Sequence, residues 1–346
     1  MTAQPPARQV PAQQASTLRK VLRMHPKTLL AIILAAGAFL TACNQDADVA
    51  TGHAERVHPQ PGPMQAASTR FTFPPTAMVG DIHLTELSGL AWDADEELLY
   101  AVSDTGYVFH FRLTLDGDAI ADIQPIRAAP LADPHLAGGT PEAFNAEGLT
   151  LVNATNGIPG DTELIASLEG TLPKIVRFSP DGTVLGNLPV PPPADDLNNY
   201  RKKGRGLESL AIHPAHGLIT APESPLLQQP QDQHALYAIG GHWSFVRQAP
   251  DSRLKGMDVL PDGSLLVLER SRQGAKDALS ASVRRVDLSN CTRDQQCASQ
   301  TIIVLPVGPD NIEGMTLLDA RHVLLAASDN GGLVTHGTTF VLLTRP

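Results

Sequence analysis

The sequence contains few cysteines and lacks the short motifs that mark several common classes of enzyme. Its 346 residues include three cysteines and 12 histidines, but no His-Glu-x-x-His pair and no histidine paired with cysteine at a zinc-binding spacing. No Gly-x-Ser-x-Gly segment occurs, and no glycine-rich nucleotide loop. These absences argue against a zinc enzyme, a serine hydrolase with a nucleophile elbow and a nucleotide-binding fold.

The first 43 residues contain no acidic residue and include one short apolar run, residues 29–40. Twelve apolar residues are too few to span a bilayer, and with the basic residues before them they are typical of a secretory signal peptide. The run ends in Leu40-Thr41-Ala42-Cys43, which resembles a bacterial lipobox, in which the cysteine is acylated and becomes the new N-terminus. An ordinary signal peptide with an incidental cysteine is the alternative.

The lipobox predicts attachment to the lipid membrane of the bacterial cell envelope through acylated Cys43. Asn44 follows where an aspartate would indicate retention at the inner membrane, so we expect an outer-membrane lipoprotein that faces the periplasm or the cell surface. Met24 is an alternative start, in which case residues 1–23 are not translated. We expect a signal peptide over residues 1–43, a flexible proline-containing tether over 44–70 and a folded domain over 71–346.

The charge of the mature chain limits its partners. Residues 1–43 hold five of the 26 basic residues and none of the 36 acidic ones, so their removal changes the formal net charge from −10 to −15. Nucleic acid is therefore not an expected partner, because its phosphates would be repelled. The two remaining cysteines, Cys291 and Cys297, predict a loop-closing disulfide in an oxidising compartment. We expect a monomer.

From residue 71 onward, short apolar runs alternate with turns, and no long stretch has a helical period. Five times a strand-like opening is followed, 14 to 22 residues later, by an acid at the end of a second apolar run. A repeat of 47 to 61 residues built from short strands predicts an all-β fold, a β-propeller of four-stranded blades. The openings begin at Ser88, Glu147, Glu208, Lys255 and Glu313, and the paired acids are Asp104, Glu169, Glu223, Glu269 and Asp329.

We expect five blades, or six if one of the longer repeats hides a further blade. The last repeat offers only three strands, and an open sheet edge would leave backbone groups unpaired. The segment 70–84 is the expected donor of the fourth strand, which would close the ring. Because equivalent positions of the blades meet at one axis, the acids of the repeats should converge at the mouth of a central channel.

Four pieces of the sequence, taken in order, resemble the family described as phytase-like, or esterase-like activity of phytase. They are residues 206–214 with 222–226, residues 265–271, residues 312–317, and residues 325–330 with 338–343. The resemblance extends over residues 80–346. It implies a propeller that hydrolyses phosphoric or carboxylic esters with the help of Ca²⁺. Ser88 and Lys255 depart from the expected acids, so the ring is not an all-acid calcium cage.

We predict a site at the channel mouth in which carboxylates bind a divalent cation and cations hold a small anionic ester or another envelope ligand. The expected metal ligands are Glu169, Glu223, Glu269 and Asp329. The expected catalytic residues are Glu208, Glu313, Arg205 and Arg270. The expected ligand-binding residues are Lys255, Glu147 and Asp104.

Two alternatives stay open at this point. The acids could instead pair with neighbouring cations as structural contacts between blades. The chain as a whole could be a non-catalytic propeller of the envelope that binds a ligand or a protein, an interpretation that Lys255 favours.

Overall fold

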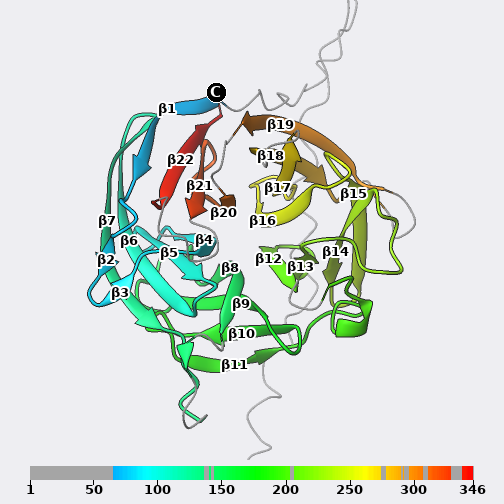
Figure 1. Ribbon diagram of the computed structural model, residues 1–346, viewed down its shortest axis with the longest axis horizontal. Coiled ribbons are helices and arrows are strands. Elements are labelled where there is room, and N and C mark those ends of the chain that lie inside the picture. The colour runs from blue at the N-terminus through cyan, green and yellow to red at the C-terminus, as the bar shows by residue number, and fades with distance from the viewer. Residues whose placement is uncertain are drawn as a thin grey trace, which may run out of the picture. The chain divides into compact units, whose positions relative to one another are not determined.

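The computed structural model describes residues 65–135, 140–141, 144–202, 206–273, 278–289, 291, 296–306, 311–328 and 337–345. In these residues the chain forms 22 strands and one short 3₁₀ helix, Leu197–Asn199. Twenty of the strands build five four-stranded antiparallel sheets around a common axis (Figure 1), and β2 and β3 form a separate hairpin. The prediction of a five-bladed β-propeller is confirmed.

Four blades are each built from consecutive strands. Blade 1 consists of β4 (Leu87–Asp93), β5 (Leu98–Ser103), β6 (Tyr107–Asp116) and β7 (Ala119–Pro130). Blade 2 consists of β8 (Asn145–Val152), β9 (Glu163–Glu169), β10 (Lys174–Phe178) and β11 (Val184–Leu188). Blade 3 consists of β12 (Leu207–His213), β13 (Gly217–Pro222), β14 (Gln233–Ala238) and β15 (Gly241–Val246). Blade 4 consists of β16 (Arg253–Val259), β17 (Leu265–Gln273), β18 (Ala278–Asp287) and β19 (Ala298–Pro306).

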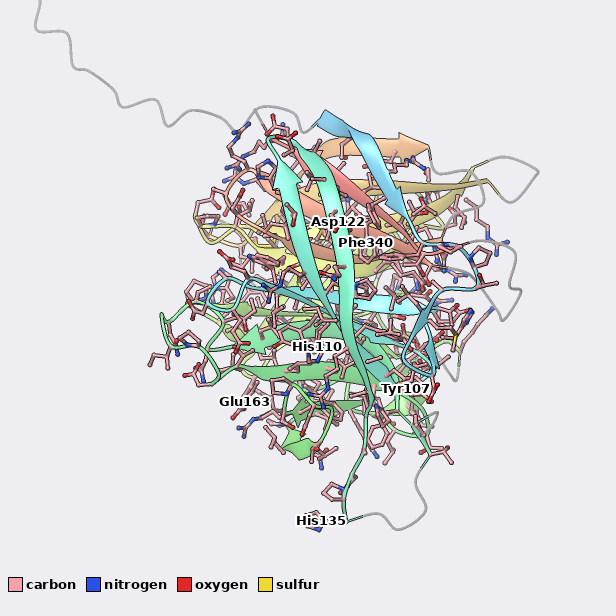
Figure 2. All side chains as sticks on the ribbon, turned by 90° about the vertical axis from the view of Figure 1, so that its left-hand side faces the viewer. Tyr107, His110, Asp122, His135, Glu163 and Phe340 are labelled. Atoms are coloured by element: carbon pink, nitrogen blue, oxygen red, sulfur yellow. A yellow bond between two sulfur atoms is a disulfide. The ribbon has the colours of Figure 1, made fainter. Side chains whose placement is uncertain are left out.

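Blade 5 joins the two ends of the domain. Its strands β20 (Asn311–Leu317), β21 (His322–Ser328) and β22 (Thr339–Thr344) are completed by β1 (Gln65–Thr72), which pairs antiparallel with β22. The predicted closure by an N-terminal strand is confirmed. The donor strand begins at Gln65, five residues before the expected segment, and β2 (Met78–Val79) and β3 (Ile82–His83) follow it. Figure 2 shows the long outer strands of blade 1, with His110 on β6 and Asp122 on β7, on the side of the molecule where β1 lies.

The hydrophobic core is divided into five clusters of buried side chains, each between two neighbouring blades. Most blades therefore bury both faces of their inner strands, and β21, for example, is buried at every position. Two-sided burial explains the near-continuous apolar runs in the sequence, since neither face of such a strand needs polar side chains. The axial positions are the main exception, and they carry the charged residues described below.

The five innermost strands, β4, β8, β12, β16 and β20, lie against one another around the axis. Each has a β-bulge at the opening of its repeat. After the bulged residue comes glycine, or serine in blade 3, because the strands approach too closely for larger side chains. A Cβ atom on Gly148 would lie 2.7 Å from Ser209 Cα, and one on Gly89 would lie 2.6 Å from the Glu147 carbonyl oxygen. The small residue of each opening is therefore a requirement of the ring itself.

Candidate functional site

The residue at the bulge of each inner strand is ionisable in four of the five blades. We call these five residues the inner ring: Ser88, Glu147, Glu208, Lys255 and Glu313. Ser88, Glu147, Glu208 and Lys255 are each at most 9% exposed. A bulge redirects a side chain out of the regular alternation of a strand. The repeated bulge thus explains how charged residues enter the axis of an otherwise apolar ring.

Lys255 is the cation at the centre of this arrangement. Its Nζ atom donates to Glu208 Oε1 and lies 2.9 Å from Glu313 Oε1 and 3.1 Å from Glu223 Oε1. The Lys255 side chain is only 5% exposed. Three carboxylates thus surround one ammonium group, which has three protons to donate. Lys255 therefore holds blades 3, 4 and 5 together.

A second set of residues, which we call the outer ring, lies one step nearer the mouth: Asp104, Glu169, Glu223, Arg270 and Ser328. Glu169 pairs with Asn145, Arg270 with Arg253 and Ser328 with Asn311. In the other two blades the backbone N–H of Asp104 donates to the Glu86 carbonyl, and that of Glu223 to the Gly206 carbonyl. These pairings make the five residues equivalent, because each stands opposite the same position of its inner strand.

This register corrects the repeat as the sequence predicted it. In blade 4 the residue equivalent to the acids is Arg270, and Glu269 stands one position earlier, opposite Leu254. In blade 5 the equivalent residue is Ser328. A shift by one residue turns a side chain to the other face of its strand. Asp329 and Arg205, which the sequence placed in the site, lie outside the described residues.

Outer-ring residues reach across to the next blade. Glu169 Oε1 accepts a hydrogen bond of 2.5 Å from the Gly206 N–H. Glu223 Oε1 lies 3.2 Å from Arg253 Nη1, and Arg270 Nη1 donates to Glu313 Oε1 over 2.8 Å. The same side chains that make up the site therefore also join blade 2 to blade 3, blade 3 to blade 4, and blade 4 to blade 5.

The two rings contain more acids than cations. Their carboxyl groups belong to Asp104, Glu147, Glu169, Glu208, Glu223 and Glu313, and their cations are Lys255 and Arg270, with Arg253 beside Glu223. Carboxylates crowded in a buried place repel one another and favour the protonated form. The rings are therefore expected to hold protons as well as charges at neutral pH.

Burial and the excess of acid raise the pKa of three ring carboxyls. Burial raises the pKa of Glu208 to about 8, although the charge of Lys255 opposes this shift. Burial, followed by the charges of Glu86 and Glu313, raises the pKa of Asp104 to about 7. Burial, followed by the charges of Glu208 and Glu313, raises the pKa of Glu147 well above its usual range. At neutral pH Asp104 is close to half-ionised, and the ionisation of Glu147 is disfavoured.

Glu313 behaves in the opposite way. Although burial disfavours its charge, Lys255 and then Arg270 lower the pKa of Glu313 to about 2. Burial likewise opposes the charge of Lys255, but Glu208 and Glu313 raise the pKa of its ammonium group above the usual range. The Lys255–Glu313 pair is thus ionised, while the ionisation of Glu147 in the same ring is disfavoured.

The axis is almost closed at the level of the inner ring. A cavity of about 10 Å³ lies there, and its lining includes Ser88, Gly148, Ser209 and Lys255. This is room for about one water molecule. A larger ligand therefore does not fit at the inner ring, whereas Asp104, Glu169 and Arg270 of the outer ring are partly exposed.

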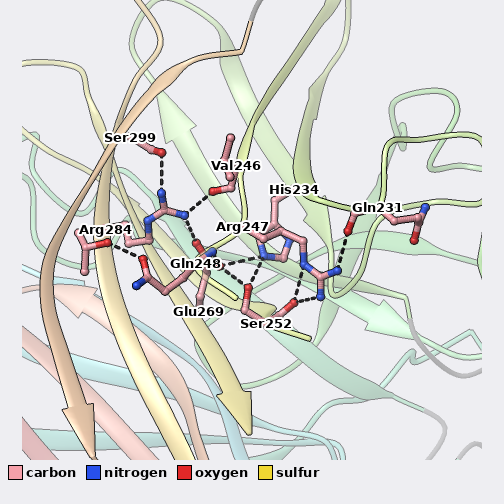
Figure 3. A network of polar contacts seen from close by, with 10 residues as sticks. Gln231, His234, Val246, Arg247, Gln248, Ser252, Glu269, Arg284 and Ser299 are labelled. Carbon is pink, nitrogen blue, oxygen red and sulfur yellow. Dashed lines mark hydrogen bonds and ion pairs between the residues drawn. The ribbon is translucent and has the colours of Figure 1, made fainter. Parts of the chain in front are cut away.

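Glu269 belongs to a separate buried network between blades 3 and 4 (Figure 3). It accepts hydrogen bonds from Ser252 Oγ over 2.5 Å, from the Gln248 N–H over 2.9 Å and from Arg284 Nη1 over 2.6 Å. Its Oε2 atom also lies 3.2 Å from His234 Nε2. Burial opposes the charge, yet these partners lower the pKa of Glu269 to about 2. Glu269 is therefore a fixed anion that joins two blades, and it does not face the channel.

Ser252, His234 and Glu269 have the composition of a catalytic triad but not its geometry. Ser252 Oγ lies 3.5 Å from His234 Nε2, the same ring nitrogen that faces Glu269. In a triad the serine and the acid contact opposite nitrogens of the imidazole. Ser252 is also fully buried. The network therefore provides no nucleophile.

The residues of the rings do not fit a divalent cation at the centre of the inner ring. Ca²⁺ takes six to eight oxygen ligands, and the oxygens of Glu208, Glu223 and Glu313 that face this point are bound to the Lys255 ammonium. A second positive charge beside Lys255 and Arg270 would be repelled. Among the described residues, no group of three or more His, Cys, Asp or Glu side chains is arranged to hold a metal ion.

Two further predictions concern cysteines. The structure joins Cys291 and Cys297 by a disulfide, which closes the polar loop before β19. Cys43 lies outside the described residues. Within the part of the chain that is described, no helix has the length and apolar character needed to cross a bilayer.

The fold and the two rings define a five-bladed β-propeller with a charged axial mouth. The family model described as phytase-like, esterase-like activity of phytase, matches residues 82–332, and the chain belongs to this family. The resemblance found in the sequence is thereby confirmed. No curated protein matches the sequence significantly.

Solved structures with a related arrangement are only distantly similar. The Dos1 propeller has 11% identity and a TM-score of 0.33, over 75% of this chain and 67% of the other. The PQQ-bound aldose sugar dehydrogenase from Streptomyces coelicolor has 12% identity and a TM-score of 0.37, over 82% and 100%. A streptogramin B lyase has 9% identity and a TM-score of 0.34, over 80% and 98%. The family assignment rests on the family model.

Proposed function

We propose that the chain hydrolyses esters at the mouth of its axial channel. The observation that supports this most strongly is the pair of rings, which bring protonatable carboxyls and a guanidinium together at the outer ring, where Asp104 and Arg270 are partly exposed. Ester hydrolysis needs a proton acceptor for water and a positive group near the developing oxyanion. The description of the family agrees with this class of reaction.

Asp104 is the proposed general base. It is partly exposed in the outer ring, and its pKa of about 7 lies near the pH at which a base works best. Water attacks the acyl carbon or the phosphorus while the Asp104 carboxylate takes its proton. The bond to the alcohol oxygen then breaks, and the same proton passes to that oxygen. The products are the free alcohol and the free acid.

Arg270 is the proposed contact for the anionic oxygen. Its Nη1 atom is bound to Glu313, and its Nη2 atom lies 3.9 Å from Glu223, beyond hydrogen-bond distance. The guanidinium therefore retains donors that can turn toward a ligand at the mouth. Arg253, with a side chain 27% exposed, lies on the same side of the mouth. Lys255 acts only through Glu208, Glu223 and Glu313 and is a positioning residue.

The sequence also predicted catalytic roles for Glu208 and Glu313. We infer that both carboxylates act indirectly, because each is bound to Lys255 and the Glu208 side chain is only 4% exposed. No step of the proposed reaction passes through Ca²⁺.

The test is turnover of 4-nitrophenyl acetate, 4-nitrophenyl phosphate and phytate by the purified mature chain. We expect hydrolysis of at least one 4-nitrophenyl ester, with a loss of about 10²–10⁴-fold in kcat for Asp104→Asn. Asp122→Asn is the matched control, since Asp122 is an exposed aspartate on the outer strand β7. Absence of turnover of all three compounds would contradict the proposal.

A non-catalytic propeller that binds an envelope ligand or a protein is the second candidate. The observation in its favour is that the Lys255 charge is used entirely in contacts between blades. Under this alternative, ring variants would change the free energy of unfolding and the affinity for the ligand. Neither the natural protein nor a variant would hydrolyse an ester.

We further propose that the chain is a lipoprotein of the bacterial envelope, attached to the outer membrane through acylated Cys43. The lipobox-like residues 40–43 after an acid-free basic and apolar segment support this proposal. Labelling with a fatty acid in the bacterial host, for the natural chain and for Cys43→Ala, tests it. Equal labelling of both chains, or none of either, would contradict it.

A further inference from the structure

A second cavity lies beside the outer ring, at the contact between blades 1 and 2. Its volume is about 220 Å³. We call it the blade-2 pocket and define it by six of its lining residues: Phe144, Leu168, Leu172, Lys174, Val176 and Asn187. The pocket is more than twenty times larger than the cavity at the inner ring, so it can hold an organic group where the axis cannot.

Strand pairing explains which side chains form the pocket. Lys174 of β10 pairs with Leu168 of β9, and Val176 pairs with Asn187 of β11. Paired residues of antiparallel strands point to the same face. All four side chains therefore lie on one face of blade 2, the face that packs against blade 1 through Leu168 and Val176.

The pocket has an apolar floor and a polar rim. Leu168 and Val176 are at most 4% exposed, and Phe144 packs edge-on against Phe178 with 5.9 Å between the ring centroids. Lys174 and Asn187 are exposed at the rim, and Leu172 is an apolar side chain that is 59% exposed. Asp133, Glu169 and Thr171 also line the pocket, so its polar side chains are nearly as many as its apolar ones. A cavity that combines an apolar floor with polar groups at its edge is the usual form of a small-molecule site.

Glu169 connects the pocket to the axial mouth. It lines the pocket, and its Oε1 atom accepts from the Gly206 N–H within the outer ring. A ligand whose reacting bond lies at the outer ring can therefore extend outward past Glu169 into the pocket without leaving the surface of the protein.

The charges at the mouth limit the kind of substrate. Six carboxyl groups against Lys255, Arg270 and Arg253 give an excess of acid, and Asp133 and Glu169 line the pocket together with the single lysine Lys174. A polyol with many phosphates would meet repulsion at each additional phosphate. A neutral carboxylic ester or a phosphate monoester needs no more positive charge than the guanidinium groups of Arg270 and Arg253 provide.

We propose that the blade-2 pocket binds the apolar part of the substrate, an aryl ring or a short acyl chain. The preferred substrates are then small esters with one such group, and polyphosphorylated polyols are poor substrates. The proposal rests on the proposed function for the reaction at Asp104, but binding of the apolar group can be measured without any reaction.

The experiment measures binding of phenol to the mature chain by NMR titration, for the natural protein and for Asn187→Trp. Asn187 is exposed, so tryptophan there covers the pocket without entering the core. We expect the dissociation constant to rise about tenfold or more, since burial of one aromatic ring is worth at least that factor. Gln300→Trp is the matched control, an exposed position on the outer strand of blade 4, and should leave the constant unchanged.

A second variant, Leu172→Asp, places a charge at an exposed position of the rim. It should also raise the dissociation constant for phenol. The ratio of kcat/KM for phenyl acetate to that for methyl acetate should fall in both variants and not in the control.

The outcomes separate the two proposals. Phenol binding that is lost in Asn187→Trp supports the pocket even if no ester is hydrolysed, in which case the proposed function alone fails. Ester hydrolysis with phenol binding and substrate ratio unchanged in both variants overturns the pocket. Hydrolysis of phytate as efficient as that of phenyl phosphate overturns the inferred substrate class.

Discussion

Lys255 Nζ lies 2.9 Å from Glu313 Oε1, and the two residues occupy the same bulge position in neighbouring blades. One blade thus supplies a cation at the point where the next supplies an acid. Because Glu208 and Glu223 bind the same ammonium group, Lys255 neutralises carboxylates from two other blades. The charge that a metal ion would bring to such a ring is already part of the polypeptide.

Lys255→Met should destabilise the domain, because it removes the cation that Glu208 contacts and leaves Glu223 and Glu313 with the charges of Arg253 and Arg270 alone. Breaking a buried ion pair from one side costs about 3–5 kcal/mol. The loss of unfolding free energy should be largest at pH 8 and smaller at pH 5, where the carboxyls can take up protons. Urea unfolding monitored by fluorescence measures it. Lys174→Met, at an exposed lysine, is the control and should lie within about 0.5 kcal/mol of the natural protein.

Glu147→Gln should stabilise the domain as the pH rises. The pKa of Glu147 is raised in the folded state above its ordinary value of 4.5. Its ionised form is therefore favoured in the unfolded chain, and the natural protein loses stability as the pH rises above 4.5. Glutamine does not titrate, so the two proteins should be equally stable near pH 4 and differ increasingly toward pH 8. A constant difference across this range would show that Glu147 is not held neutral.

Gly148→Ala should cost about 1–3 kcal/mol, because its Cβ would lie 2.7 Å from the backbone of Ser209. Gly256→Ala is the matched comparison, since its Cβ would come no closer than 3.1 Å, to Met315 Cβ. Thermal unfolding of the two variants should rank Gly148→Ala as the less stable. The reverse order would mean that the inner strands are not packed as described.

The pH dependence of ester hydrolysis should follow Asp104. A general base works only when ionised, so kcat/KM should rise with pH through a pKa of about 7 and level off above it. In Asp104→Asn this limb should disappear together with most of the rate. A rate that is independent of pH between 5 and 8 in the natural protein would exclude Asp104 from this role.

The repeat made the fold predictable from the sequence. Five openings at bulge positions and an incomplete last repeat are enough to derive five blades and closure by an N-terminal strand. The inner ring followed as well, because Glu147, Glu208, Lys255 and Glu313 each begin an opening.

The outer ring could be predicted only in part. Hairpins of different length separate the first two strands of the blades, so counting from the opening gives Glu269 where strand pairing gives Arg270. The blade-2 pocket had no signal in the sequence, since Leu168 and Val176 look like ordinary core residues. Their position becomes distinctive only when Lys174 and Asn187 lie beside them on the same face.

We infer that Lys255 takes the place of a metal ion at the inner ring. This inference is tested most directly by calorimetric titration of the metal-free mature chain with Ca²⁺, for the natural protein and for Glu313→Gln. We predict no binding heat that depends on Glu313. Saturable binding of Ca²⁺ by the natural protein that is lost in Glu313→Gln would contradict the claim.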